Sequence, residues 1–465
     1  MSTNHTTATP TEAATQQQPH ANKRTPLDAT TKRRIIIAST IGTTIEFYDF
    51  YAYATAAVAV FPFLFFPKNE DPTVGLLASF ATFGLAFLGR PLGSVMFGHF
   101  GDRIGRKATL VGSLLTMGIA TFLIGCLPTY GTIGLAAPAL LALMRFCQGL
   151  GLGGEWSGAA LLATETADHG KRAWAAMWPQ LGAPFGFLAA NGLFLVLVSS
   201  LGHTNGETTG AFMEWGWRIP FLLSAVMVIV GLYVRFKLEE TPVFTTAVNS
   251  GKKVRMPLAT VFKTSATPLV IGTFVMVSCY TMFYLITTWI LSFGIGNKEA
   301  GLGLGIPYID FLKIQLVTIF AFLVGIPLAG RLADTRGRKT TLTAVSVIMI
   351  AFGLSFPLFL GTDRATEFSV LMFLLIGMFI MGLIFGPMSA VLPELFPTNV
   401  RYTGSGIAYN VSSILGAAIA PFVATYLNKT YGVASVGYYL VIVCIISLIA
   451  IRLMPETRGA DMTEI

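Results

Sequence analysis

The sequence predicts an all-α membrane protein in which twelve transmembrane helices form two pseudo-symmetric six-helix bundles, with both termini in the cytoplasm. Three observations lead to this fold class: an apolar composition, twelve long apolar runs, and one polar motif that occurs once in each half of the chain. Of the 465 residues, 54% are hydrophobic and 12% are charged, whereas a soluble domain carries about 25% charged residues. With a mean hydropathy of +0.68, this composition excludes an ordinary soluble globular protein.

Twelve apolar runs between polar breaks are long enough to cross a bilayer, because a transmembrane helix needs about 20 mostly apolar residues. The runs of the first half lie near 35–60, 74–99, 109–127, 136–163, 173–200 and 218–237. The runs of the second half lie near 267–293, 311–332, 341–360, 368–392, 405–427 and 436–454.

The basic residues are distributed asymmetrically about these runs. Of the 31 Lys and Arg residues, 23 lie in the N-terminal tail, in the breaks after the even-numbered runs and at the C-terminus. The positive-inside rule then places both termini in the cytoplasm, so the net charge of +8 reflects topology rather than nucleic-acid binding. The predicted divisions are a disordered tail over 1–33, a first bundle over 34–238, a cytoplasmic loop over 239–266, a second bundle over 267–455 and a cytoplasmic C-terminus over 456–465.

One polar motif occurs twice, 232 residues apart, after the second and the eighth run. It reads GHFGDRIGRK at 98–107 and GRLADTRGRK at 330–339. This repeat resembles the signature of the major facilitator superfamily; the first copy matches it fully, and the second departs from it at Ala333 and Arg336. The resemblance implies two six-helix halves that rock about a central cavity.

The motif residues are candidates for a cytoplasmic gate. An acid at a helix end can pair with a base of the opposite half in a protein that switches between states, and we expect Asp102 to pair with Arg401. The alternative is that the motif only sets the topology of the loops. The predicted gating residues are Asp102, Arg103, Arg106, Asp334, Arg338 and Arg401.

Several charged side chains lie inside the predicted spans, where each costs about 2.5–3.5 kcal/mol on insertion scales. Glu46 and Asp49 are three residues apart and share one helix face. Arg145, Gln148 and Glu155 form a polar stripe on an otherwise apolar helix. These polar faces can find partners only toward the interior of the bundle.

Two interpretations of these groups are open. In the first, Glu46 or Asp49 neutralises Arg90 or Arg145, and the network is structural. In the second, Asp49 or Glu46 exchanges a proton with solvent while an arginine meets a substrate anion, because the guanidinium fork gives a carboxylate two parallel hydrogen bonds. Aromatic residues at helical spacing more often pack than bind, but they remain candidates. The predicted substrate-binding residues are Arg90, Arg145, Gln148, Glu155, Gln180, Asn191, Tyr280, Tyr284, Tyr409 and Asn410.

Further motifs in both halves narrow the resemblance. They are GTTIEFYDF at 42–50, RPLG at 90–93, RFCQGLGLGGEW at 145–156, WRIPF at 217–221 and LPELFPTNVR at 392–401. Together they resemble the metabolite:proton symporter family, which includes permeases for shikimate, citrate, α-ketoglutarate and proline/betaine. The resemblance implies solute:proton symport into a bacterial cytoplasm.

The expected function is proton-coupled import of a small carboxylate-bearing metabolite by alternating access. We expect a monomeric, multi-pass protein of the bacterial inner membrane, with the solute, the proton and the lipid bilayer as partners and the proton gradient in place of a cofactor. No His/Cys cluster in the sequence suggests a metal, and no nucleophile–base set suggests an enzyme. The glycines at 149–154 are expected to pack helices rather than bind a dinucleotide, because they lie inside an apolar run. The alternatives are a symporter of a zwitterionic osmolyte such as proline or betaine, and a proton-driven exporter.

Overall fold

The computed structural model describes the backbone of residues 29–69, 71–104, 106–153, 160–161, 163–164, 167, 170–204, 207–208, 210–237, 257–397 and 400–459. It describes the side chains at these positions except 29–32, 35, 98–104, 106–110, 203–204, 207–208, 234–237 and 257–260.

The first half consists of long helices joined by short elements. They are α1 (Ala29–Ala59), α2 (Phe61–Leu64), α3 (Pro72–Ile104), α4 (Arg106–Cys126), α5 (Tyr130–Ile133), α6 (Ala136–Leu152), α8 (Arg172–Gln180), α9 (Gly182–Leu201), the antiparallel strands β1 (His203–Thr204) and β2 (Glu207–Thr208), α10 (Ala211–Glu214), the 3₁₀ helix η1 (Gly216–Arg218) and α11 (Ile219–Lys237).

The second half repeats this plan, with π-helical turns inside two of its spans. Its elements are α13 (Pro257–Thr264), α14 (Ala266–Tyr284), the π-helix η2 (Leu285–Trp289), α15 (Ile290–Ile295), α16 (Tyr308–Arg336), α17 (Arg338–Leu354), α18 (Phe356–Leu360), α19 (Glu367–Phe385), α20 (Met388–Glu394), α21 (Arg401–Ser413), the π-helix η3 (Ile414–Ala418), α22 (Ala420–Tyr431) and α23 (Val433–Leu453).

Each of the twelve predicted runs coincides with a helix or with a helix broken by a short turn, so the predicted all-α class is confirmed. Within the described ranges, eight helices are long and apolar enough to cross a membrane, and the apolar helices at Val111–Cys126 and Ala136–Leu152 are shorter. Two details differ from the expectation. The fourth run is helical to Leu152 in α6, after which 154–159 lie outside the description, and part of the predicted loop over 239–266 forms the helix α13.

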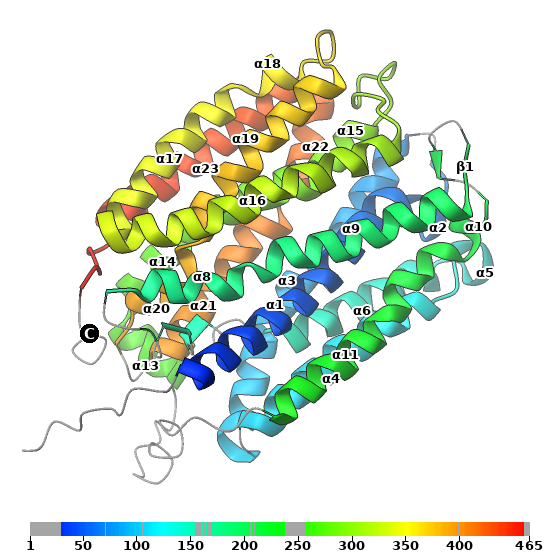
Figure 1. The fold of residues 1–465 in the computed structure, drawn as a ribbon. Coiled ribbons are helices and arrows are strands. Elements are labelled where there is room, and N and C mark those ends of the chain that lie inside the picture. The colour runs from blue at the N-terminus through cyan, green and yellow to red at the C-terminus, as the bar shows by residue number, and fades with distance from the viewer. Residues whose placement is uncertain are drawn as a thin grey trace, which may run out of the picture.

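The helices lie roughly side by side, with the C-terminal end of the chain and the start of α1 at one end of the molecule (Figure 1). We call this the terminal end; α5, β1 and α18 lie at the opposite end. The two helices that end in the copies of the motif, α3 and α16, each contact helices of the opposite half. In the first half, α3 contacts α21, η3 and α22, and in the second half α16 contacts α8 and α9.

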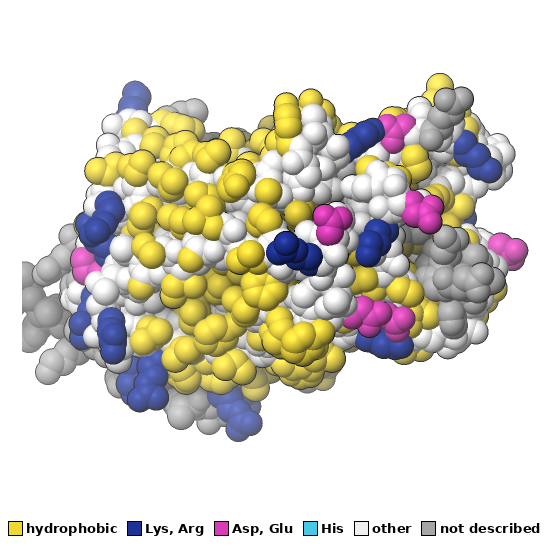
Figure 2. Space-filling model, turned by 90° about the horizontal axis from the view of Figure 1, so that it is seen from above, with side chains coloured by type: hydrophobic (Ala, Val, Ile, Leu, Met, Phe, Trp, Pro, Cys, Tyr) yellow, Lys and Arg dark blue, Asp and Glu magenta, His cyan; other side chains and the backbone are white. Residues whose placement is uncertain are grey.

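The exterior fits a bilayer. Hydrophobic side chains cover much of the face seen in Figure 2, whereas Lys and Arg gather at the end shown on the left and charges of both signs lie toward the other end. Large side chains such as Ile229, Val324 and Ile442 are more than half exposed, which is unfavourable in water and suits contact with lipid.

Glycines bring α3 and α6 into backbone contact. A Cβ atom added to Gly149 would lie 2.0 Å from the carbonyl oxygen of Ala86, and one added to Gly93 would lie 2.0 Å from that of Leu150. Small residues allow helices in membranes to approach this closely. The expected packing role of the glycines near 149 is confirmed, and the close crossing holds the arginine-bearing parts of α3 and α6 together.

Replacing Gly149 by Ala is expected to lower the midpoint of thermal unfolding of the purified protein. The added methyl group would meet backbone rather than a movable side chain, and overpacking of this kind costs about 1–3 kcal/mol or more. Gly192→Ala on α9 is the matched control, because a Cβ at Gly192 meets nothing within 4 Å. Equal midpoints for the two variants would contradict this account of the crossing.

Candidate functional site

A charged cluster is buried inside the first half, and its first part joins α1 to α3. Arg90 Nη2 lies 3.4 Å from Glu46 Oε1, with side-chain exposures of 5% and 3%. The guanidinium also lies over an aromatic ring, with Arg90 Cζ 4.5 Å from the ring centre of Phe50. The ion pair is long for a hydrogen bond, and stacking on the ring adds a cation–π contact. These contacts hold the guanidinium in place, and the ion pair with Glu46 occupies only part of its N–H donors.

The second part of the cluster is a hydrogen-bonded chain from α1 through α4 to α6. Thr121 Oγ1 donates to Asp49 Oδ2 at 3.1 Å, and Gln148 Nε2 donates to Thr121 Oγ1 at 2.8 Å. Arg145 Nη1 in turn donates to Gln148 Oε1. Arg145 Cζ lies 4.1 Å from the ring centre of Tyr53. Arg145 and Gln148 of the predicted stripe are thus brought together with Asp49 of α1, by a threonine that the sequence analysis did not single out.

A small cavity lies beside this cluster, between the two halves. The space at its centre is about 10 Å³, roughly the room that one water molecule needs. Of the four charged side chains in this cluster, Arg90 contributes to the wall of the cavity. The lining residues are Phe47, Arg90, Met276, Cys279, Tyr280, Phe283, Tyr284, Met381, Phe385 and Tyr409.

The second half gives this cavity a largely aromatic wall. The rings of Tyr280 and Tyr284 stack with centres 6.5 Å apart, and the rings of Tyr280 and Tyr409 lie 5.3 Å apart. The three predicted tyrosines therefore come together at the cavity. Their role in binding a solute stays a prediction.

Three other predicted binding residues bridge helices instead of lining the cavity. Asn191 Oδ1 accepts a hydrogen bond from Thr55 at 2.6 Å, within the first half. Gln180 Nε2 donates to the Phe385 carbonyl at 3.0 Å. Asn410 Nδ2 donates to Ser94 Oγ at 2.9 Å. The last two contacts join the halves, so in this conformation Gln180 and Asn410 hold the halves together. Predicted Glu155 lies outside the described residues.

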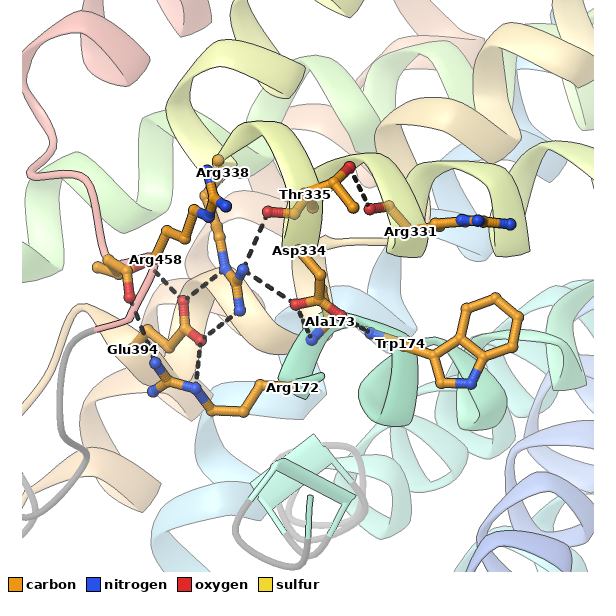
Figure 3. A network of polar contacts seen from close by, with 12 residues as sticks. Arg172, Ala173, Trp174, Arg331, Asp334, Thr335, Arg338, Glu394 and Arg458 are labelled. Atoms are coloured by element: carbon orange, nitrogen blue, oxygen red, sulfur yellow. Dashed lines mark hydrogen bonds and ion pairs between the residues drawn. The ribbon is translucent and has the colours of Figure 1, made fainter. Parts of the chain in front are cut away.

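A buried polar network closes the terminal end, and it contains the second copy of the motif (Figure 3). Glu394 on α20 accepts hydrogen bonds from Arg338 Nε and Nη2 at 3.1 and 3.0 Å, and its Oε1 lies 3.4 Å from Arg172 Nε of α8. Asp334 accepts from the backbone N–H groups of Ala173 and Trp174 at 3.0 and 2.9 Å. An acid of the second half thus caps the first turn of α8 in the first half, where a carboxylate is favoured by the helix dipole.

The predicted gating residues divide into three groups. Asp334 and Arg338 lie in the network that joins the halves, and Arg338 Nη1 lies 3.0 Å from Asp334 Oδ1. Arg401 Nε donates to the carbonyl oxygens of Pro393 and Phe396 within its own half, at 3.1 Å each. The side chains of the first copy, Asp102, Arg103 and Arg106, lie outside the description. The pairing of Asp102 with Arg401 therefore stays a prediction, while Glu394 and Arg172 are network members that the sequence analysis missed.

An ion pair joins the halves at the opposite end. Lys429 Nζ at the end of α22 bonds to Asp71 Oδ2 just before α3, and Thr73 N donates to Asp71 Oδ1 at 2.9 Å. The hydrogen bond from Lys429, followed by those from Thr73, lowers the pKa of Asp71 to about 2. Asp71 therefore stays ionised in mildly acidic surroundings. The two halves therefore contact each other at both ends of the molecule.

Comparisons with known proteins agree with this architecture. Residues 40–416 match the Major Facilitator Superfamily. The chain is 51% identical to the inner membrane metabolite transport protein YhjE of Escherichia coli K12, over 95% of this chain and 98% of that protein. It is 36% identical to the shikimate transporter of the same organism, over 92% of this chain and 95% of that protein.

A solved structure shows the same fold. The proton:xylose symporter XylE bound to 6-bromo-6-deoxy-D-glucose superposes with a TM-score of 0.69 at 18% identity, over 94% of this chain and 99% of that one. The buried cluster, the small cavity between the two halves and the sequence matches lead to one conclusion. The chain is a multi-pass membrane transporter that belongs to the major facilitator superfamily.

Proposed function

We propose that the protein is a symporter that imports a small carboxylate-bearing metabolite together with a proton across the bacterial inner membrane, by alternating access. The observation that carries this proposal is the guanidinium of Arg90 at the wall of a small cavity between the halves. Its Nε has no hydrogen-bond partner among the described residues. A solute carboxylate could take this donor as part of a bidentate contact, for which arginine is suited.

The charge balance of the cluster supports coupling to a proton. Two acids, Glu46 and Asp49, face two guanidinium groups, Arg90 and Arg145, all buried, so the cluster is formally neutral. A carboxylate that entered the cavity would add an uncompensated negative charge in a region of low dielectric, which is costly. One proton on an acid of the cluster would restore neutrality and allow the loaded cavity to close.

The contacts at the two ends support alternating access. The Glu394 network joins the halves at the terminal end and the Asp71–Lys429 pair joins them at the other. Transport requires that one set opens while the other stays closed, as when two repeats rock about a fixed central site. The similarity to a shikimate transporter supports a carboxylate as the solute.

The aromatic wall favours one other solute class, a zwitterionic osmolyte. Tyr280, Tyr284 and Tyr409 together with Phe283 could surround a quaternary ammonium group through cation–π contacts, while Arg90 held the carboxylate of the same molecule. Proline or betaine would be examples of such a solute.

Uptake by proteoliposomes containing the purified protein tests the proposal. Organic acids, betaines and sugars are compared as solutes under an inward proton gradient, with and without a protonophore, and with protein-free liposomes as the control. We expect accumulation of an organic acid that the protonophore abolishes. Accumulation of betaine alone would favour the osmolyte, and accumulation that survives the protonophore would contradict proton coupling.

A further inference from the structure

One hydroxyl group in the charged cluster has two acceptors for its single hydrogen. Thr121 Oγ1 lies 3.1 Å from Asp49 Oδ2 and 3.0 Å from the carbonyl oxygen of Met117. Gln148 Nε2 donates to the same Thr121 oxygen at 2.8 Å. A hydroxyl has one donor hydrogen and two acceptor lone pairs, so Thr121 can serve only one of its two acceptors at a time.

We propose that Thr121 is a positioning residue whose hydroxyl switches between these acceptors and so keeps Asp49 hydrogen-bonded in both protonation states. When Asp49 is ionised, the hydroxyl donates to Oδ2. When Oδ2 carries a proton, Asp49 donates to Thr121 Oγ1 and the hydroxyl turns to the Met117 carbonyl. Gln148 occupies the other lone pair in both states. Asp49 takes up the proton from the aqueous phase to which the cavity is open in one conformation. It releases the proton to the phase on the other side of the membrane after the cavity has opened there.

The energetic argument is that Thr121 Oγ1 and Asp49 Oδ2 stay hydrogen-bonded to each other in both states. An unpaired buried polar group costs about 1–3 kcal/mol, so a partner that could only donate would penalise the protonated acid. Asp49 and Thr121 are both fully buried, where such a penalty applies. The rotating hydroxyl removes the penalty in both directions and makes protonation reversible within a transport cycle.

The same reasoning separates the two acids of the cluster. Glu46 faces the guanidinium of Arg90 at 3.4 Å, and a guanidinium can only donate, so this partner favours the ionised form of Glu46. Asp49 faces a partner that suits both forms. This difference assigns the exchangeable proton to Asp49 rather than to Glu46. The assignment rests on the proposed symport function.

The surrounding charges are compatible with this assignment. Among the described residues, Tyr48 on the same helix and Arg145 on α6 interact electrostatically with Asp49. Glu46 on α1 and Arg90 on α3 are the other charged members of the cluster. Gln148 holds Arg145 through its Oε1 and reaches Thr121 through its Nε2. The hydroxyl can therefore turn without releasing Arg145 from its place beside the acid.

Infrared titration of the purified, reconstituted protein tests the switch. The carbonyl stretch of protonated Asp49 is identified as the band that disappears in Asp49→Asn. In Thr121→Val the ionised carboxylate loses a donor and the protonated acid loses an acceptor. The hydrogen bond to the charged form is the stronger of the two, so its loss dominates and protonation of Asp49 becomes easier. We expect the pH midpoint of this band to rise by about one pH unit, roughly a tenfold gain in proton affinity.

Two variants distinguish the switch from a general effect on structure. Thr121→Ser keeps a hydroxyl and should restore the wild-type midpoint. Thr116→Val, on the same helix, removes a hydroxyl that donates to the Gly112 carbonyl at 2.8 Å, and should leave the midpoint unchanged. If Thr121→Val is not recovered from membranes, Thr121→Ala gives the same comparison.

Three results would overturn the inference: a wild-type midpoint in Thr121→Val, an equal rise in Thr121→Ser, or the absence of any band that Asp49→Asn removes. The titration uses neither a solute nor a proton gradient. Its outcome therefore decides the role of Thr121 even if uptake by the wild-type protein resists a protonophore, which would contradict symport alone.

Discussion

Asp49→Asn is expected to abolish accumulation of the solute under a proton gradient while preserving exchange of solute across the membrane. The amide resembles the protonated acid in shape and charge, so the loaded cavity can still close, but it carries no exchangeable proton. For one proton per solute, a gradient of one pH unit sustains roughly tenfold accumulation, equivalent to 1.4 kcal/mol. The variant should therefore fall from roughly tenfold accumulation to none, as measured with radiolabelled solute in proteoliposomes.

A second acid provides the control for this experiment. Asp310 is exposed on α16, where it accepts a hydrogen bond from Lys313 at 2.8 Å, and Asp310→Asn should accumulate solute as the wild type does. Counterflow, in which unlabelled internal solute drives entry of labelled solute, shows whether Asp49→Asn is folded and able to cycle. Gradient-driven accumulation by Asp49→Asn at the wild-type level would remove Asp49 from the coupling mechanism.

Glu394→Gln is expected to open the terminal end of the protein. The carboxylate is fully buried and faces two arginines, Arg338 of its own half and Arg172 of the other. Removing one member of a buried charged set costs about 3–5 kcal/mol. The share of this cost that comes from Arg172, which belongs to the other half, falls only on the conformation in which the halves meet here. A full inversion from 1:99 to 99:1 needs about 5.5 kcal/mol, so we expect a partial shift of the population toward the state open at this end.

Labelling of a cysteine at the junction measures this shift. Ser389 is buried, and its hydroxyl donates to the Ala176 carbonyl of the other half at 2.6 Å. Ser389→Cys, in a background without the native cysteines, should react with a water-soluble maleimide at least tenfold faster when combined with Glu394→Gln. Glu299→Gln, at an exposed acid, is the matched control. Equal labelling rates for Ser389→Cys alone and for its combinations with Glu394→Gln and Glu299→Gln would show that the network does not hold this end closed.

The helices and the identity of the buried charges could be predicted from the sequence, because both depend on the residues of each span alone. A span must be predominantly apolar to lie in hydrocarbon, so each of the twelve runs carries its own signal. A charge inside such a run is costly and therefore conspicuous, which is why Glu46, Asp49, Arg90 and Arg145 could be named without a structure. The structure brings all four into one buried cluster.

The partners of these groups were decided only by the tertiary structure. Thr121 carries no distinctive signal, because a threonine within a span commonly bonds to its own helix, as Thr121 also does to Met117. Its contact with Asp49 depends on how α1 and α4 are rotated against each other. The same holds for Glu394, whose arginine partners lie far away in the sequence. The direction of a polar side chain is set by helix packing between distant segments, whereas the presence of the helix is set by its own residues.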